Sequence, residues 1–207
     1  MYQRTILLKT YSIITLLVIT STGCRESANK YLRRGLKMHK EQDYQGAISN
    51  FNTAVELDAA YKNAYFFRGL AKYNLHEYQE AINDFTFALK LDTTYENAYY
   101  YRGITYYSLQ NMRGALADFD KAVSLDPNEA NYFYRRGLVK RSFVDSRGAI
   151  SDFTRAIEID PGYAMAYYFR GIEKLEEGQS EEACKDFSKA TELGSELASS
   201  AQKAYCK

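Results

Sequence analysis

The sequence predicts an all-α protein made of five helix-turn-helix repeats and a C-terminal capping helix. Four sets of residues, which we call columns, recur with one constant spacing along the chain, the 34 residues that separate Gly35 from Gly69. Within each of these periods, apolar residues recur at three- and four-residue steps, which is the pattern of an amphipathic helix. The repeat windows are residues 28–61, 62–95, 96–129, 130–163 and 164–197. The columns are Gly35, Gly69, Gly103, Gly137 and Gly171; Ala47, Ala81, Ala115, Ala149 and Ala183; Phe51, Phe85, Phe119, Phe153 and Phe187; and Ala54, Ala88, Ala122, Ala156 and Ala190.

Each window holds two helical patterns. In the second window they cover residues 63–75 and 78–91, with a break at His76-Glu77. Glycine inside a helix costs roughly 1 kcal/mol relative to alanine, so five repeated glycines indicate a close approach of two helices. We expect the column phenylalanines to fill the space between neighbouring pairs. A short helix over residues 196–207 is expected to cap the last repeat.

Two segments carry a family resemblance. Ala-Tyr-Tyr-Tyr-Arg-Gly at 98–103 and Ala-Leu-Ala-Asp-Phe-Asp-Lys-Ala at 115–122 resemble the tetratricopeptide repeat (TPR). The resemblance covers residues 28–197 and departs in having proline only at Pro127 and Pro161. It implies a right-handed superhelical solenoid whose first helices line a concave, partner-binding side, as in bacterial TPR lipoproteins.

The N-terminal residues do not fit the repeat. Arg4 and Lys9 precede a mostly apolar run over 11–20, which is the pattern of a secretory signal peptide over residues 1–23. The end of this segment resembles a bacterial lipoprotein cleavage box, although Ser21 stands where an aliphatic residue is usual. We expect lipid on the Cys24 thiol, followed by a short linker at 24–27; the alternatives are an ordinary secreted protein and a signal anchor.

Composition excludes several functions. The 27 basic and 26 acidic residues nearly balance, and this net charge does not indicate a nucleic-acid partner. His39 and His76 lack cysteine or carboxylate neighbours at metal-ligand spacing, and no catalytic or phosphate-binding motif is present. We therefore expect no metal, no cofactor, no small-molecule substrate and no enzymatic activity.

Arginines precede the column glycines, and aspartates precede the column phenylalanines in four repeats. The first interpretation is that the arginines form structural ion pairs with the aspartates. The second is that the arginines bind an acidic ligand. The arginines are Arg34, Arg68, Arg102, Arg136 and Arg170, facing Asn50, Asp84, Asp118, Asp152 and Asp186.

Besides Cys24, the chain has two cysteines, Cys184 and Cys206. They lie at nearly equal distances along the chain from Gly194, one before it and one after it. In an antiparallel helix pair such positions come side by side, which predicts a disulfide in an oxidising compartment. In a reducing compartment they are expected to be two small buried hydrophobic residues.

The expected binding surface lies on the first helices of repeats two to five. Aromatic residues recur there with asparagines three residues earlier, which suits contact with a peptide. The alternatives are that the asparagines cap their helices and that the tyrosines pack between repeats. The candidate residues are Asn63, Phe66, Tyr73, Asn97, Tyr100, Tyr107, Asn131, Tyr134 and Tyr168.

Together these observations predict a non-enzymatic, lipid-anchored scaffold that binds a protein or peptide in its concave groove. Arg25 after Cys24 favours, by resemblance, the outer membrane facing the periplasm if the cell is Gram-negative. A pilotin-like assembly factor of an outer-membrane machine is the first alternative, and an accessory subunit of an envelope enzyme is the second.

Overall fold

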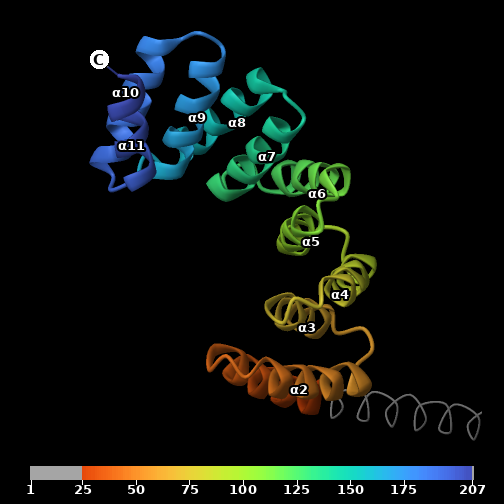
Figure 1. Ribbon diagram of the computed structural model, residues 1–207. Helices are drawn as coiled ribbons and strands as arrows, with labels where there is room; N and C mark the ends of the chain where they lie inside the picture. Colours follow the sequence, from red (N-terminus) through yellow and green to blue (C-terminus); the bar gives the residue numbers. More distant parts are fainter. Residues whose placement is uncertain (1–24, 207) are drawn as a thin grey trace, which may run out of the picture. The chain divides into compact units, whose positions relative to one another are not determined.

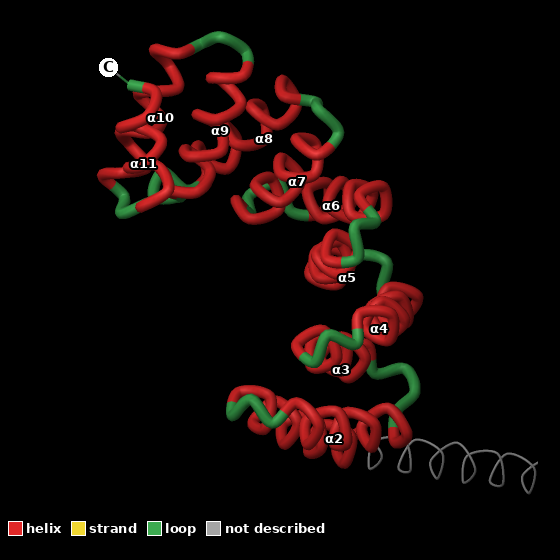
Figure 2. Tube along the Cα trace, viewed as in Figure 1, coloured by secondary structure: helices red, strands yellow, loops and turns green. Residues whose placement is uncertain are grey.

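A computed structural model describes residues 25–206, and within them every regular element is an α-helix (Figure 2). The helices alternate in helix-turn-helix pairs, as the sequence predicts, so the all-α fold class is confirmed. The expected signal segment, residues 1–23, and the expected lipidation residue Cys24 lie outside the described residues. None of the described helices is both long and apolar enough to cross a bilayer.

The chain divides into two compact units, at Thr93 and Thr94. The first unit contains a helix over residues 25–40, then α2 (Tyr44–Leu57), α3 (Lys62–Asn74) and α4 (Tyr78–Leu91), which are labelled in Figure 1. Its core forms where Leu32 of the first helix, Phe51 of α2 and Ala64 of α3 meet. Each helix therefore buries one face against the next one along the chain.

The second unit contains the last three helix pairs and the capping helix. Its elements are α5 (Glu96–Ser108), α6 (Met112–Leu125), α7 (Ala130–Ser142), α8 (Ser146–Ile159), α9 (Ala164–Glu176), α10 (Ser180–Glu192) and α11 (Glu196–Tyr205). Every helix packs against its successor, and α5 also touches α7. The contact between α5 and α7 brings two first helices side by side.

The turn inside each pair has one recurrent geometry. In the second repeat, His76 takes a left-handed φ of 62°, and the Glu77 and His76 amides donate to the Lys72 and Tyr73 carbonyls. These two bonds satisfy carbonyls at the end of α3 that the helix itself leaves open. The residues at this position with positive φ are Gln42, His76, Gln110, Val144 and Gly178.

The column glycines and phenylalanines meet inside each pair. A Cβ built on Gly103 would lie 2.8 Å from Cε1 of Phe119, and the other four pairs give 2.4 to 2.8 Å. The phenylalanines are fully buried. The sequence placed these rings between neighbouring pairs, whereas each ring lies first against the glycine on the first helix of its own pair. Phe51 and Phe153 also stack on Phe67 and Phe169 of the next pair, so one ring serves both contacts.

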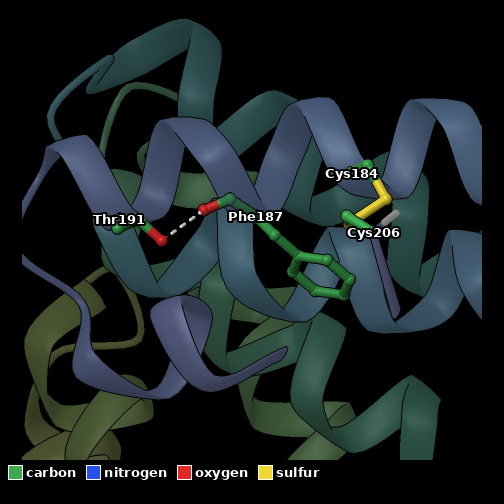
Figure 3. The surroundings of a disulfide bond; sticks show 4 residues. All are labelled: Cys184, Phe187, Thr191 and Cys206. Carbon is green, nitrogen blue, oxygen red and sulfur yellow. Dashed lines mark hydrogen bonds between the residues drawn. A yellow bond between two sulfur atoms is a disulfide. The ribbon is translucent and has the colours of Figure 1, made fainter. Parts of the chain in front are cut away.

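The C-terminal helix is fastened to the last repeat by a disulfide. Cys184 of α10 and Cys206, which directly follows α11, are joined with their Cα atoms 5.6 Å apart (Figure 3). The bond lies one helical turn from Phe187, and Cys206 packs on the cluster that Phe187 forms with Ala183 and Ala201. The structure thus brings together the two cysteines that the sequence analysis paired.

The contact between Gly103 and Phe119 predicts a specific sensitivity. Gly103→Ala is expected to lower the free energy of unfolding by about 1–3 kcal/mol, because the buried ring has no room to move, although alanine favours the helix. The control is Gly162→Ala, whose added Cβ would have only Asp160 Oδ1 within 4 Å, at 3.2 Å. Urea unfolding of both variants is the measurement; equal stabilities would contradict the steric account.

Candidate functional site

The predicted aromatic column lies mainly in the core. Phe66 and Tyr134 are only 5% and 8% exposed, so the expectation that they line an open surface is wrong for these two residues. The Tyr134 ring centroid lies 6.0 Å from that of Phe153 and 4.8 Å from that of Tyr163. The reason is geometric: this position points into the joint between two consecutive pairs, where apolar area is removed from water.

Tyr100 and Tyr168 are half-buried in the equivalent joints. The Tyr100 ring lies 4.9 Å from that of Tyr132, and the Tyr168 ring lies 6.2 Å from that of Phe187. Burial raises the pKa of Tyr100 and of Tyr134, so both hydroxyls stay protonated at neutral pH. These aromatic residues therefore pack between repeats, which was the alternative to an exposed binding surface.

The asparagine column links successive repeats. The Tyr163 hydroxyl donates to Asn131 Oδ1 at 2.9 Å, and the Tyr132 hydroxyl donates to Asn97 Oδ1 at 3.3 Å. The expected capping role is wrong for Asn63, Asn97 and Asn131, because each is the second residue of its helix. The N-caps are Tyr61, Tyr95 and Glu129.

The arginine column is occupied by structural pairing. Arg68, Arg102, Arg136 and Arg170 each donate from Nε and Nη2 to both oxygens of the aspartate in the second helix of the same pair, over 2.5 to 2.9 Å. Such bidentate pairs are strong and directional. In three of these repeats Nη1 also reaches back to the second helix of the preceding repeat, at Asn52, Asp120 and Thr154. The pairing interpretation is confirmed, and these four arginines are committed to the fold.

One repeat differs in the support of its aspartate. Lysines four residues after the arginines reach Asp84, Asp152 and Asp186 at 2.7 to 2.8 Å. In the third repeat Tyr106 takes the place of this lysine, and Arg102 lies over its ring. Burial raises the pKa of Asp118, and the hydrogen bond and charge of Arg102 only partly offset that effect.

A groove opens on the first helices of the second unit. It has a volume of about 340 Å³ and lies among α5, α7, α9 and the turn between α7 and α8. We call it the second-unit groove. Its lining residues are Tyr107, Leu138, Arg141, Ser142, Val144, Ser146, Phe169 and Glu176.

Of the predicted site residues, Tyr107 lines this groove. Its counterpart Tyr73 is half-buried in the first unit, with its ring 5.5 Å from that of Tyr78. The asparagines and the other column aromatics are not among the lining residues. The sequence analysis did not predict Leu138, Arg141 and Phe169 as groove residues. The repeat columns alone do not show which face of a helix is covered by the neighbouring helix pair.

The groove wall combines an aromatic ring with a buried ion pair. Arg141 Nε donates to Glu173 Oε1 at 2.6 Å, and its guanidinium carbon lies 5.3 Å from the Phe169 ring centroid. Glu173 is only 1% exposed, so Arg141 is the group that keeps this carboxylate paired. Arg141 therefore presents its remaining donors to the groove from a fixed position.

Arg135 lines a smaller cavity that shares Tyr107 and Leu138 with the groove. Its Nε is buried and has no hydrogen-bond partner among the described residues. Burial lowers the pKa of Arg135, but the hydrogen bond and charge of Tyr100 outweigh this effect, so the pKa is raised and the group stays charged. Arg33 holds this position in the first repeat, and Phe67, Tyr101 and Phe169 hold it in the other three, so the sequence did carry a signal here: Arg135 is an arginine between two aromatic members of its column.

Val144 forms the groove's strained rim. Its φ is 61°, a value that β-branched residues avoid, and its side chain is 86% exposed. The equivalent turns hold Gln42, His76, Gln110 and Gly178. A strained, exposed valine beside a groove costs stability without adding core packing, which is typical of a functional position.

The described residues contain no cluster of three or more His, Cys, Asp or Glu side chains placed to hold a metal ion. His39 lies with its Nε2 3.1 Å from Asn74 Nδ2, and burial lowers the pKa of its imidazole. The polar groups in and beside the groove are two guanidiniums, hydroxyls and the carboxylates of Glu173 and Glu176.

Paired helices with a repeated glycine–phenylalanine contact and a groove on the first helices define a helical-repeat interaction protein. Residues 96–129 match the family model of the tetratricopeptide repeat. No curated protein matches the chain. Residues 96–129 are thus a tetratricopeptide repeat.

Several solved structures have a similar fold. YrrB, described as a TPR protein with an unusual peptide-binding site, is 25% identical with a TM-score of 0.72, covering 84% of this chain and 90% of its own. MamA is 26% identical with a TM-score of 0.74, covering 88% and 97%. Pseudomonas aeruginosa PilF is 16% identical with a TM-score of 0.77, covering 88% of each chain, a likeness that shows the fold alone.

The burial of Tyr134 reverses the behaviour expected of an exposed binding residue. Tyr134→Ala is expected to cost about 3–5 kcal/mol of stability, because the ring fills a joint between Phe153 and Tyr163. Tyr205→Ala is the control, since Tyr205 is 56% exposed and should change stability by less than about 0.5 kcal/mol. Thermal and urea unfolding of the two variants is the measurement, and a neutral Tyr134→Ala would contradict the core assignment.

Proposed function

We propose that this protein is a lipid-anchored scaffold whose second-unit groove binds a peptide segment of a partner protein. The observation that carries the proposal is the groove itself. Tyr107, Leu138 and Phe169 supply an apolar floor, and Arg141, Ser142 and Glu176 supply hydrogen-bonding groups. A concave surface with an apolar base and a few placed polar groups is the usual form of a ligand site.

Two features in and beside the groove favour recognition over packing. Val144 keeps a strained backbone at the rim, and Arg135 has a buried, unpaired Nε in the small cavity that shares Tyr107 and Leu138 with the groove. Both features reduce stability. YrrB offers a parallel, since its structure is described as having an unusual peptide-binding site.

The anchor rests on the N-terminal sequence. Residues 1–23 have the signal pattern and Cys24 is the acceptor thiol, which places the mature protein in the cell envelope, and at the outer membrane facing the periplasm if the cell is Gram-negative. The Cys184–Cys206 disulfide suits the oxidising compartment to which such a leader directs a protein.

The groove is tested by site-specific photo-crosslinking in intact cells. A photoreactive residue at Ser142 is expected to capture a partner, whereas one at Ser124 is not. Both serines are exposed near the end of a helix and bond back to its carbonyls, but only Ser142 lines the groove. Tyr107→Ala should abolish the product by removing about 2 kcal/mol or more of binding energy, and Tyr205→Ala should not.

A second variant separates binding from folding. Val144→Gly is expected to raise the free energy of unfolding by about 1 kcal/mol, because glycine adopts positive φ freely, as Gly178 does at the same position. It should also weaken capture at Ser142, because the apolar rim is removed. Increased stability with undiminished capture would exclude Val144 from the site. The same yield at Ser142 and Ser124 would reject the groove as a whole.

The anchor is tested by Cys24→Ser. The variant is expected to move from the membrane fraction to the soluble fraction, and the wild type should incorporate a labelled fatty acid that the variant lacks. Membrane retention of the variant together with an unlabelled wild type would reject lipidation and leave a signal anchor as the explanation. The protein captured at Ser142 decides between a general scaffold and the two alternatives: an outer-membrane channel would favour the assembly factor, and an envelope enzyme the accessory subunit.

A further inference from the structure

The first helix presents four basic residues on one exposed face. Lys30, Arg33, Arg34 and Lys37 are all exposed and recur at three- and four-residue steps, so they share one side of the helix. We call these four residues the basic face. On the opposite side Ala28 is buried, and Leu32 and Gly35 are buried against α2.

The equivalent positions in the second repeat are occupied by residues that pack in the protein interior. Lys30, Arg33 and Lys37 correspond, one repeat later, to Ala64, Phe67 and Ala71 of α3. Ala64 and Ala71 are fully buried, and Phe67 stacks on Phe51 of α2. In α3 this face packs on the preceding repeat, and in the first helix it is charged and open.

The internal contacts of the first repeat do not neutralise the basic face. Asn50 stands where the other repeats have an aspartate, and it bonds to Gly46 and Met38. Arg34 lies over the Tyr31 ring instead of pairing with a carboxylate in its own repeat. The ion pair formed by Lys37 is a 3.9 Å contact with exposed Glu41, which contributes little in water.

Charge is concentrated in this part of the chain. Residues 25–41 contain six basic and two acidic residues, whereas the whole chain is nearly balanced, with 27 and 26. Like charges three and four residues apart oppose helix formation, so the basic face is unfavourable for the isolated protein. Beside it lies an open depression of about 600 Å³ lined by Glu26, Ser27, Asn29, Lys30, Arg33 and Arg34.

We propose that the basic face binds the anionic phospholipid headgroups of the membrane that holds the protein. The proposal rests on the anchor at Cys24, which lies six residues before Lys30, so at most about 20 Å of chain separates the lipid from the face. Each Lys or Arg held near an anionic bilayer strengthens binding by about fivefold. The face thereby adds an electrostatic attachment to the lipid anchor, and it holds the first repeat against the headgroups.

Vesicle flotation with the full chain carrying Cys24→Ser removes the acyl contribution. Vesicles of phosphatidylcholine with about 30% phosphatidylglycerol are compared with pure phosphatidylcholine at about 50 mM and about 500 mM salt, where screening differs strongly. We expect binding to the anionic vesicles at low salt and its loss at high salt. Lys30→Gln, Arg33→Gln, Arg34→Gln and Lys37→Gln together should weaken low-salt binding by at least about tenfold.

The matched control removes four exposed basic residues from the second unit. Arg113→Gln, Lys121→Gln, Arg147→Gln and Lys203→Gln change the net charge equally and retain Arg4 and Lys9. This variant should bind within about twofold of the unmodified Cys24→Ser chain. Circular dichroism of both quadruple variants checks that the helices remain.

Three results would overturn the proposal. Equal binding to both vesicle types would show no preference for anionic headgroups, and equal weakening in the two quadruple variants would show a net-charge effect only. Self-association without vesicles that depends on the basic face would assign it to a second copy of the chain. None of these outcomes bears on the anchor, which fractionation of Cys24→Ser in cells reports separately.

Discussion

The contact between a glycine of the first helix and a phenylalanine of the second helix sets the geometry of every repeat. With no Cβ on the glycine, the ring approaches the first helix so closely that any side chain there would overlap it. Each paired arginine precedes its glycine by one position, and each paired aspartate precedes its phenylalanine by one position, so the two contacts share the same register. An apolar contact and a bidentate ion pair therefore hold the helices of the last four pairs side by side, and neither contact forms if the helices slide by one residue.

This arrangement explains why most of the predicted binding residues became structural. Phe66 and Tyr134 pack against the column phenylalanine of their own pair. Tyr134 also contacts Phe169 on the first helix of the next pair, so its ring fills the joint between the two pairs. Asn97 and Asn131 accept hydrogen bonds from tyrosines further along the chain. What remains accessible is the next stretch of each first helix, which is where Tyr107, Leu138 and Arg141 line the groove.

The first and the last helix pair differ in what covers their outer faces. At the C-terminal end, α11 and a disulfide cover the last pair, so apolar area is buried by the chain itself. At the first helix, lysines and arginines replace the alanines and the aromatic that pack in the second repeat. A charged terminal face is soluble without a cap, and it is free to interact with something outside the protein.

The sequence by itself determined the all-α class, the number and spacing of the helix pairs, the turn positions, the arginine–aspartate pairing and the choice of Cys184 with Cys206. These follow from periodicity and from local chemistry, which a linear reading captures. Only the tertiary structure decided which side of each first helix stays open, because burial depends on how the next pair packs. Tyr100 and Tyr107 lie on the same helix two turns apart, and both looked like groove residues. The packing of Tyr132 and Phe119 placed Tyr100 in a joint, while the close approach of α5 and α7 left Tyr107 at the wall of the groove.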